Sequence, residues 1–125
     1  MKISEVMNKA FVVDDSISLK QAAKIMSDKN IGSLIVIKKD KIVGIVTERD
    51  IMKNIGKIGG KISSVMTKNV VTIEFKDTID NAALIMAKNK IKRLPVMKKG
   101  ILVGIITATD ILANSDSLNE EFLLD

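Results

Sequence analysis

The 125-residue chain contains an internal repeat, and this repeat restricts the possible folds more than any other feature of the sequence. Residues 22–52 match residues 82–112 at a constant offset of 60, with about half of the positions identical and no gap. Upstream, residues 3–7 match residues 62–66 at an offset of 59. A unit of about 60 residues buries little apolar surface alone, so two copies are expected to pack together. We assign the copies to residues 1–58 and 59–113, followed by an acidic C-terminal tail at 114–125.

Each copy has the same expected order of elements: strand, helix, strand, strand, helix. Ser18 and Thr78 are expected N-caps, because each precedes apolar residues at helical spacing. β-rich runs separated by polar turns predict a hairpin in each copy. The predicted fold class is therefore α/β (α+β), with two βαββα units packed sheet to sheet. The expected elements are helices beginning at Leu19 and Ile79, strands at 34–37, 42–46, 94–97 and 101–106, and short helices beginning at Glu48 and Ala108.

Several residue types that catalysis usually needs are absent from the chain. It has no histidine, cysteine, tryptophan or tyrosine, which excludes Ser-His-Asp and Cys-His triads and zinc sites with the usual ligands. Acid–base catalysis would fall to Asp, Glu or Lys, so an enzyme ranks last among the functions considered. We expect no enzymatic activity, no metal and no required cofactor.

The sequence shows no segment typical of membrane insertion or secretion. No apolar run approaches the ~18 residues that a membrane span needs. The first residues carry Lys2 and Glu5 and are not followed by the apolar core of a signal peptide. We therefore expect a cytoplasmic protein without a membrane partner.

Charge is divided unevenly along the chain. Residues 113–125 hold four acids and no base, which leaves 20 bases against 11 acids in the rest, a net charge of +9. A basic body attracts phosphates, nucleic acid or an acidic partner. Its lysines are scattered, however, and three phenylalanines are the only aromatic side chains on which bases could stack. A solvated Lys-rich surface is therefore the simpler interpretation.

A motif of the form Gly-h-h-Thr-x-x-Asp, where h is apolar, ends the second hairpin strand of each copy. Free N–H groups at a helix start, together with a threonine hydroxyl, favour a phosphate. The aspartate three residues on can accept hydrogen bonds from the 2′- and 3′-hydroxyls of a ribose. A glycine inside a strand permits close approach of another backbone or a ligand. The members are Gly44, Thr47 and Asp50 in the first copy and Gly104, Thr107 and Asp110 in the second.

The same motif has a purely structural interpretation. Thr-x-x-Asp is also a capping box, in which the two side chains bond each other's backbone N–H groups. The residues alone leave both interpretations open. The two arginines among 20 basic residues, Arg49 and Arg93, favour ligand binding, because a planar guanidinium suits phosphate better than lysine does.

The two motifs, together with Ile-Lys-Arg-Leu-Pro-Val at 91–96, resemble the CBS-domain family over essentially the whole chain. The form is that of a stand-alone tandem pair of the prokaryotic or archaeal type. The resemblance implies two units related by pseudo-twofold symmetry, with up to two clefts that accept adenosine compounds. It also implies that such pairs often dimerise into a flat disc.

The resemblance also implies which residues line each cleft, because in this family the base lies between the first strand of one unit and the hairpin of its partner. The cleft of Asp110 would be lined by Thr107, Ile105, Arg93 and Lys92, with Ala10, Phe11 and Val12. The cleft of Asp50 would be lined by Thr47, Ile45, Arg49 and Ser33, with Asn69, Val70 and Val71. Since Arg93 matches a phosphate-contacting position and the first copy has Ser33 there, we expect stronger binding at the Asp110 cleft.

The predicted function is a regulatory sensor that binds AMP, ADP, ATP or S-adenosylmethionine. A partner effector protein would read the resulting change in packing, and a homodimer is expected. The alternatives are a ligand-free dimeric adaptor and nucleic-acid binding by the basic body. In the tail, Leu118, Phe122 and Leu123 have the spacing of a short amphipathic helix, which would dock on its own body, line a dimer contact or fray.

Overall fold

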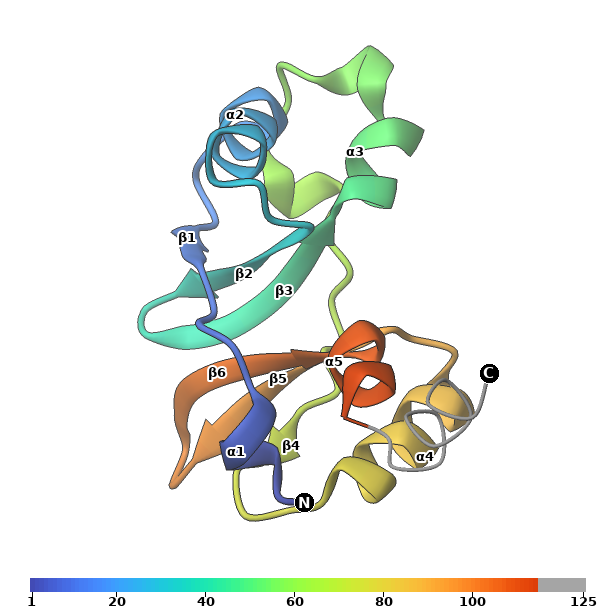
Figure 1. Cartoon of the computed structure of the whole chain (residues 1–125). Coiled ribbons are helices and arrows are strands. Elements are labelled where there is room, and N and C mark those ends of the chain that lie inside the picture. The colour runs from blue at the N-terminus through green and yellow to red at the C-terminus, as the bar shows by residue number, and fades with distance from the viewer. Residues whose placement is uncertain (115–125) are drawn as a thin grey trace, which may run out of the picture. The chain divides into compact units, whose positions relative to one another are not determined.

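The computed structural model describes residues 1–114, which form two compact units (Figure 1). We call residues 11–70 the Asp50 unit, and residues 1–10 together with 71–114 the Asp110 unit, after the motif aspartate in each. These units differ from the sequence repeats, because the segment leading into each copy belongs to the unit of the other copy. The predicted amphipathic tail helix lies outside the described residues.

The Asp50 unit contains a three-stranded sheet in the order β1-β2-β3. Strand β1 pairs with β2 in parallel, and β2 pairs with β3 as an antiparallel hairpin. Helices α2 and α3 lie on the same side of this sheet (Figure 1). The elements are β1 (Val12–Asp14), α2 (Leu19–Lys29), β2 (Ser33–Lys38), β3 (Lys41–Thr47), α3 (Glu48–Lys53), and the 3₁₀ turns η1 (Ile55–Lys57) and η2 (Ile62–Ser64).

The Asp110 unit repeats this architecture in the order β4-β5-β6. The elements are α1 (Ile3–Val6), β4 (Ile73–Glu74), α4 (Ile79–Asn89), β5 (Arg93–Lys98), β6 (Ile101–Thr107) and α5 (Ala108–Ala113). The predicted mixed α/β fold, with two repeated sheet-and-helix units, is confirmed. None of the helices formed by residues 1–114 has the length and apolar character that a membrane span requires.

The long helices begin and end where local chemistry dictates. The hydroxyl oxygens of Ser18 and Thr78 accept hydrogen bonds from the backbone N–H groups three residues later, which confirms both predicted N-caps. The helices stop at Asn30 and Lys90, which adopt left-handed conformations with φ of 52° and 54°. Asparagine tolerates that conformation well, whereas for lysine the surrounding fold imposes it.

Each unit has its own apolar core between its helices and one face of its sheet. The helices supply one side, including Met26 and Met86, which are 4% and 5% exposed. The strands supply Leu34, Val36 and Val46 in the Asp50 unit and Leu94, Val96 and Ile106 in the Asp110 unit. Because side chains alternate along a strand, the residues between these lie on the other face of each sheet.

The exchanged segments complete both cores. Ile3 is fully buried in the core of the Asp110 unit, and Ile62, its repeat equivalent, is fully buried in that of the Asp50 unit. The N–H of Ile3 donates to the carbonyl of Asp77 at 2.8 Å, and the N–H of Ile62 donates to the carbonyl of Ile17 at 3.0 Å. In each unit, therefore, the leading segment of one copy completes the core formed by the rest of the other copy.

Candidate functional site

The repeated motif forms the joint between a hairpin and a short helix in both units. Thr107 N–H and the Thr107 hydroxyl both donate to Asp110 Oδ2 at 2.9 Å, and Asp110 N–H donates to Thr107 Oγ1 at 3.2 Å. The corresponding distances between Thr47 and Asp50 are 2.9, 3.1 and 3.3 Å. The capping box therefore forms in both copies, which confirms the structural interpretation of the motif.

The capping box leaves half of each carboxylate available. Both capping bonds that each aspartate side chain accepts end on Oδ2, from the N–H and the hydroxyl of the threonine. No residue in the described part of the chain donates to Oδ1 of Asp50 or Asp110. A carboxylate oxygen accepts about two hydrogen bonds, so Oδ1 retains the capacity to bind a diol. Capping and ligand binding are thus compatible, and the cap fixes the orientation of the carboxylate.

The strand register places Arg93 beside this joint. Arg93 lies opposite Thr107 in the β5–β6 pair, and Ser33 lies opposite Thr47 in the β2–β3 pair. Since Leu94 faces the core, Arg93 and Thr107 share the face of the sheet that points away from the helices. Arg93 is half-buried, and its guanidinium makes no ion pair with an acid among residues 1–114. The register therefore places a half-buried cation opposite Thr107, the residue that caps Asp110.

The two motif glycines admit a second segment of backbone. A Cβ on Gly104 would lie 2.8 Å from the carbonyl oxygen of Asn8 and 2.8 Å from Met7 Sδ. Asn8 exchanges two hydrogen bonds with Ile105, at 2.8 and 2.9 Å. The predicted role of this glycine in close approach is therefore confirmed, with a backbone as the neighbour.

The Asp50 unit repeats this contact. A Cβ on Gly44 would lie 3.0 Å from the carbonyl oxygen of Thr67 and would overlap the side chain of Met66. Thr67 pairs with Ile45 through hydrogen bonds of 2.9 and 3.0 Å. Sequence reasoning did not single out Asn8 and Thr67, although the 59-residue offset makes them equivalent.

The other predicted site residues are divided between the units. Ala10 follows Asn8 in the Asp110 unit, whereas Phe11 and Val12 belong to the Asp50 unit. Asn69 and Val70 follow Thr67 in the Asp50 unit, whereas Val71 belongs to the Asp110 unit. The assignment of Phe11 and Val12 to the Asp110 cleft, and of Val71 to the Asp50 cleft, stays a prediction.

Two predicted basic site residues are exposed. Lys92 precedes β5, and its carbonyl accepts a hydrogen bond from Ala108 N–H at 2.8 Å, which ties the hairpin to α5. Arg49 lies on α3 beside Asp50. Both residues are therefore close in sequence to a joint, and their side chains are exposed to solvent.

Acidic side chains elsewhere do not form a metal centre. Within residues 1–114 no three aspartates or glutamates gather closely enough to hold a metal ion. Asp14 at the end of β1 accepts hydrogen bonds from the hydroxyl and the backbone N–H of Ser16. These two bonds, helped by Lys38, hold the pKa of Asp14 below its ordinary value.

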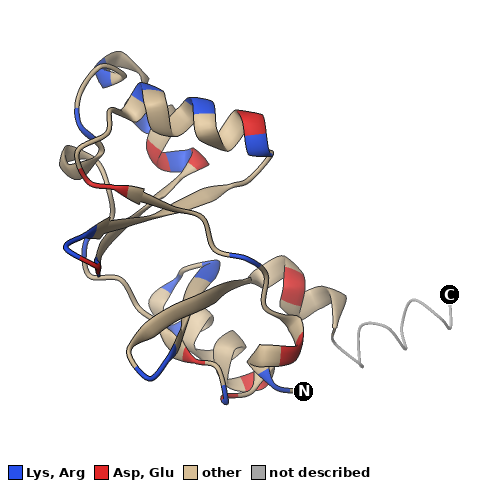
Figure 2. Ribbon diagram, turned by 90° about the vertical axis from the view of Figure 1, so that its left-hand side faces the viewer, with Lys and Arg blue, Asp and Glu red and all other residues tan. Residues whose placement is uncertain are grey.

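Basic residues are spread over both units. Figure 2 shows lysines and arginines on helices, hairpin turns and connecting segments, with acidic residues among them. The ion pairs present within residues 1–114 are exposed or partly exposed, such as Lys24 with Asp28 at 3.1 Å. Such interspersed charge favours a solvated surface over a track for nucleic acid.

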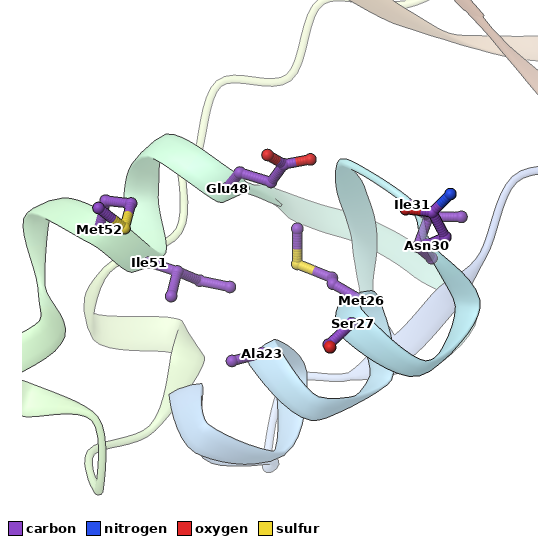
Figure 3. Close-up of a pocket in the computed structure, with 8 residues that line it drawn as sticks. All are labelled: Ala23, Met26, Ser27, Asn30, Ile31, Glu48, Ile51 and Met52. Atoms are coloured by element: carbon purple, nitrogen blue, oxygen red, sulfur yellow. The ribbon is translucent and has the colours of Figure 1, made fainter.

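The Asp50 unit also has an apolar groove on its helical side (Figure 3). Its volume is about 380 Å³, and Met52 on its rim is 73% exposed. In the Asp110 unit, Leu112 occupies the position equivalent to Met52 and is 57% exposed. The groove is lined by Ala23, Met26, Ser27, Asn30, Ile31, Glu48, Ile51 and Met52.

Two units built from one repeated sequence, each with a capped Thr-x-x-Asp joint beside a glycine contact, define a tandem α/β repeat protein. The model of the CBS domain matches residues 3–57 and 62–116. The chain therefore belongs to the CBS-domain family, as the resemblance in its motifs predicted.

Known proteins with similar sequences are mostly longer than this chain. The chain is 38% identical over 108 residues to inosine-5′-monophosphate dehydrogenase of Thermoplasma acidophilum, which covers 86% of this chain and 22% of the dehydrogenase. It spans 22% to 38% of the length of the first three curated relatives. The similarity therefore concerns a CBS portion of these proteins.

Solved structures match nearly the whole chain. The CBS domain pair of protein MJ0100, in complex with 5′-methylthioadenosine and S-adenosyl-L-methionine, has a TM-score of 0.83 at 32% identity, covering 89% of this chain and 92% of that chain. A hexameric CBS-CP12 protein from bloom-forming cyanobacteria has a TM-score of 0.86 at 28% identity, covering 95% of this chain and 74% of that chain. The same fold thus occurs both with bound adenosine compounds and in an oligomer.

Proposed function

We propose that this CBS pair is a non-enzymatic regulatory module that binds an adenosine-containing ligand and signals to an effector protein. The observation that carries the proposal is Oδ1 of Asp50 and Asp110, which has no donor among residues 1–114 and is held in place by a capping box. A fixed anionic acceptor suits the paired hydroxyls of a ribose. The MJ0100 CBS pair, which binds two adenosine compounds, supports this ligand class.

The two joints differ in their cationic neighbours, so we propose unequal binding. Arg93 lies beside Thr107 and makes no ion pair within the described chain, while the equivalent position beside Thr47 is Ser33. A guanidinium binds phosphate oxygens in a bidentate manner. AMP, ADP or ATP should therefore bind more tightly at Asp110, while the Asp50 joint relies on Ser33 and Arg49 and accepts an uncharged tail more readily.

The experiment is a thermal-shift and calorimetric screen with AMP, ADP, ATP, S-adenosylmethionine and 5′-methylthioadenosine, with inosine monophosphate and ribose 5-phosphate as controls for the base. A ligand at 100 times its Kd stabilises the folded protein by about 2.7 kcal/mol. We expect micromolar binding of at least one adenosine compound, with two unequal sites. A flat melting temperature across the whole set, in protein shown to be folded, would refute the sensor.

A second function, interaction with another protein, is favoured by the exposed apolar residues of the helical side. The groove of the Asp50 unit and the exposed Met52 and Leu112 are apolar surface of the kind that dimer contacts bury. We propose a homodimer, and the hexameric CBS-CP12 protein supports association within the family. Sedimentation velocity over a hundredfold concentration range tests it, and a monomer at every concentration would contradict it.

A further inference from the structure

The helical sides of the two units are built alike but differ in surface chemistry. In the Asp50 unit, residues of α2 and α3 and of the turn after α2 line the apolar groove (Figure 3). We call these groove residues the Asp50 face. The residues 60 positions later, on α4, on α5 and in the turn after α4, form what we call the Asp110 face. The repeat therefore allows the two faces to be compared position by position.

Each face contains a single charged residue, and the two charges have opposite signs. On the Asp50 face it is Glu48, whose equivalent on the Asp110 face is Ala108. On the Asp110 face it is Lys90, whose equivalent is Asn30. Both charged side chains are exposed, and neither makes an ion pair with another residue of 1–114. Both charges are therefore available to a partner.

The apolar surfaces of the two faces are also different. The Asp50 face is hollowed into a groove with Met52 on its rim. Beside the Asp110 face, α4 carries Leu84, which is 69% exposed where α2 has Lys24, and α5 carries the exposed Leu112. Projecting leucines and an apolar groove both lose contact with water when they meet. The two faces are therefore suited to each other in apolar character as well as in charge.

A contact between two identical faces would gather like charges. Two Asp50 faces bring two Glu48 carboxylates into one interface, and two Asp110 faces bring two Lys90 ammonium groups. One face of each kind brings one carboxylate and one ammonium group, which attract. The flanking helices add to this difference, because α2 carries three lysines and one aspartate, whereas α4 carries one lysine and one aspartate. Two α2 helices therefore repel each other more than α2 and α4 do.

We propose that the Asp50 face of one copy of this chain binds the Asp110 face of a second copy. Glu48 of the first copy then lies opposite Lys90 of the second, and apolar side chains of the second copy enter the groove. The inference rests on the homodimer proposed above and specifies which surfaces of the two copies associate. Since each copy has one face of each kind, a closed dimer makes this contact twice.

Single-cysteine cross-linking identifies the faces that meet, because the native chain has no cysteine. Met52→Cys marks the Asp50 face, and Leu112→Cys marks the equivalent position of the Asp110 face. One variant carries a heavy-isotope label, the two are mixed and treated with a short bis-maleimide, and mass spectrometry identifies the products. The cross-link between positions 52 and 112 should predominate over both like-with-like products. Ile101→Cys, which is 66% exposed on the β5–β6 hairpin, is the control and should cross-link with neither variant.

Charge reversal tests the pair that this contact brings together. Glu48→Lys should raise the Kd of the dimer about tenfold in sedimentation, because repulsion replaces an attraction. Lys90→Glu should have a similar effect for the same reason. The double variant restores one charge of each sign and should return the Kd close to the native value. Glu74→Lys makes the same charge change on β4 and should leave the Kd unchanged.

Three results would overturn this inference and leave the homodimer itself standing. The first is a dimer that cross-links mainly 52 with 52 or 112 with 112. The second is a dimer in which neither position cross-links more than the Ile101→Cys control. The third is a dimer whose Kd changes no more with Glu48→Lys than with Glu74→Lys. A chain that stays monomeric at every concentration would overturn both the inference and the homodimer. None of these measurements uses an adenosine ligand, so the sensor proposal is tested separately.

Discussion

Replacing Asp110 with asparagine separates the two roles of this side chain, which are helix capping through Oδ2 and the proposed binding of ribose through Oδ1. In the structure both capping bonds from Thr107 end on Oδ2, at 2.9 Å each. The amide oxygen of an asparagine can accept the same two bonds, so Asp110→Asn keeps the cap. Its Nδ2 then stands in place of Oδ1, where it offers donors and no negative charge to the ribose hydroxyls.

The size of the expected effect follows from the bonds involved. Two hydrogen bonds from a ribose diol to a carboxylate contribute about 1.5–3 kcal/mol each. Allowing for partial replacement by the amide, a loss of about 3 kcal/mol corresponds to a roughly 150-fold weaker Kd for AMP. Asp110→Ala should weaken binding at least as much, and loss of the cap should also cost about 1 kcal/mol of folding stability.

The assay is calorimetric titration with AMP, paired with thermal unfolding of each variant. We expect the Asp110→Asn variant to melt close to the native temperature while its tighter AMP site disappears. Asp50→Asn is the matched control, since it makes the same change in the other unit and should leave the tighter site in place. AMP binding of native affinity by a folded Asp110→Asn variant would refute the ribose role of Oδ1.

Three further predictions concern packing, phosphate recognition and titration. Gly104→Ala places a Cβ 2.8 Å from the carbonyl oxygen of Asn8 and should cost about 1–3 kcal/mol in denaturant unfolding. Arg93→Gln should weaken ATP binding about tenfold in calorimetry and leave 5′-methylthioadenosine binding unchanged, because only the former has phosphates. Ser16→Ala removes a bond to Asp14 and should raise the pKa of that carboxyl toward its ordinary value, as followed by an NMR pH titration. Since its folded pKa is depressed, Asp14 stabilises the native state above its ordinary pKa, and this contribution is lost as the pH falls through the folded pKa.

Controls for these predictions come from the same chain. Gly56→Ala introduces a Cβ that meets nothing within 4 Å, so its stability should stay within about 0.5 kcal/mol of native. Arg49→Gln removes the other arginine and should leave the tighter ATP site intact. Equal stability of the Gly104 and Gly56 variants would contradict the close-approach argument. An Arg93→Gln variant that weakens both ligands alike would contradict a phosphate contact.

Local chemistry was readable from the sequence alone. The hairpins follow from β-rich runs around polar turns, and the N-caps Ser18 and Thr78 follow from hydroxyls placed before apolar helical faces. The close approach at Gly104 could be predicted because only a residue without a Cβ fits a second backbone there. These features depend on neighbours in the chain or on one residue type, so one sequence contains enough information.

Only the tertiary structure decided which segment completes which core and what each motif aspartate does. Ile3 and Ile62 occupy equivalent positions in the repeat, so residue type cannot tell whether each fills its own core or that of the other copy. The folded chain places Ile3 with the second copy, because the connection after α1 runs past Ile105 on β6 before it reaches β1. Likewise, Thr-x-x-Asp specifies a cap, but the sequence does not specify whether the cap engages one carboxylate oxygen or both. In the packed joints both bonds end on one oxygen, and the other oxygen has no donor among residues 1–114.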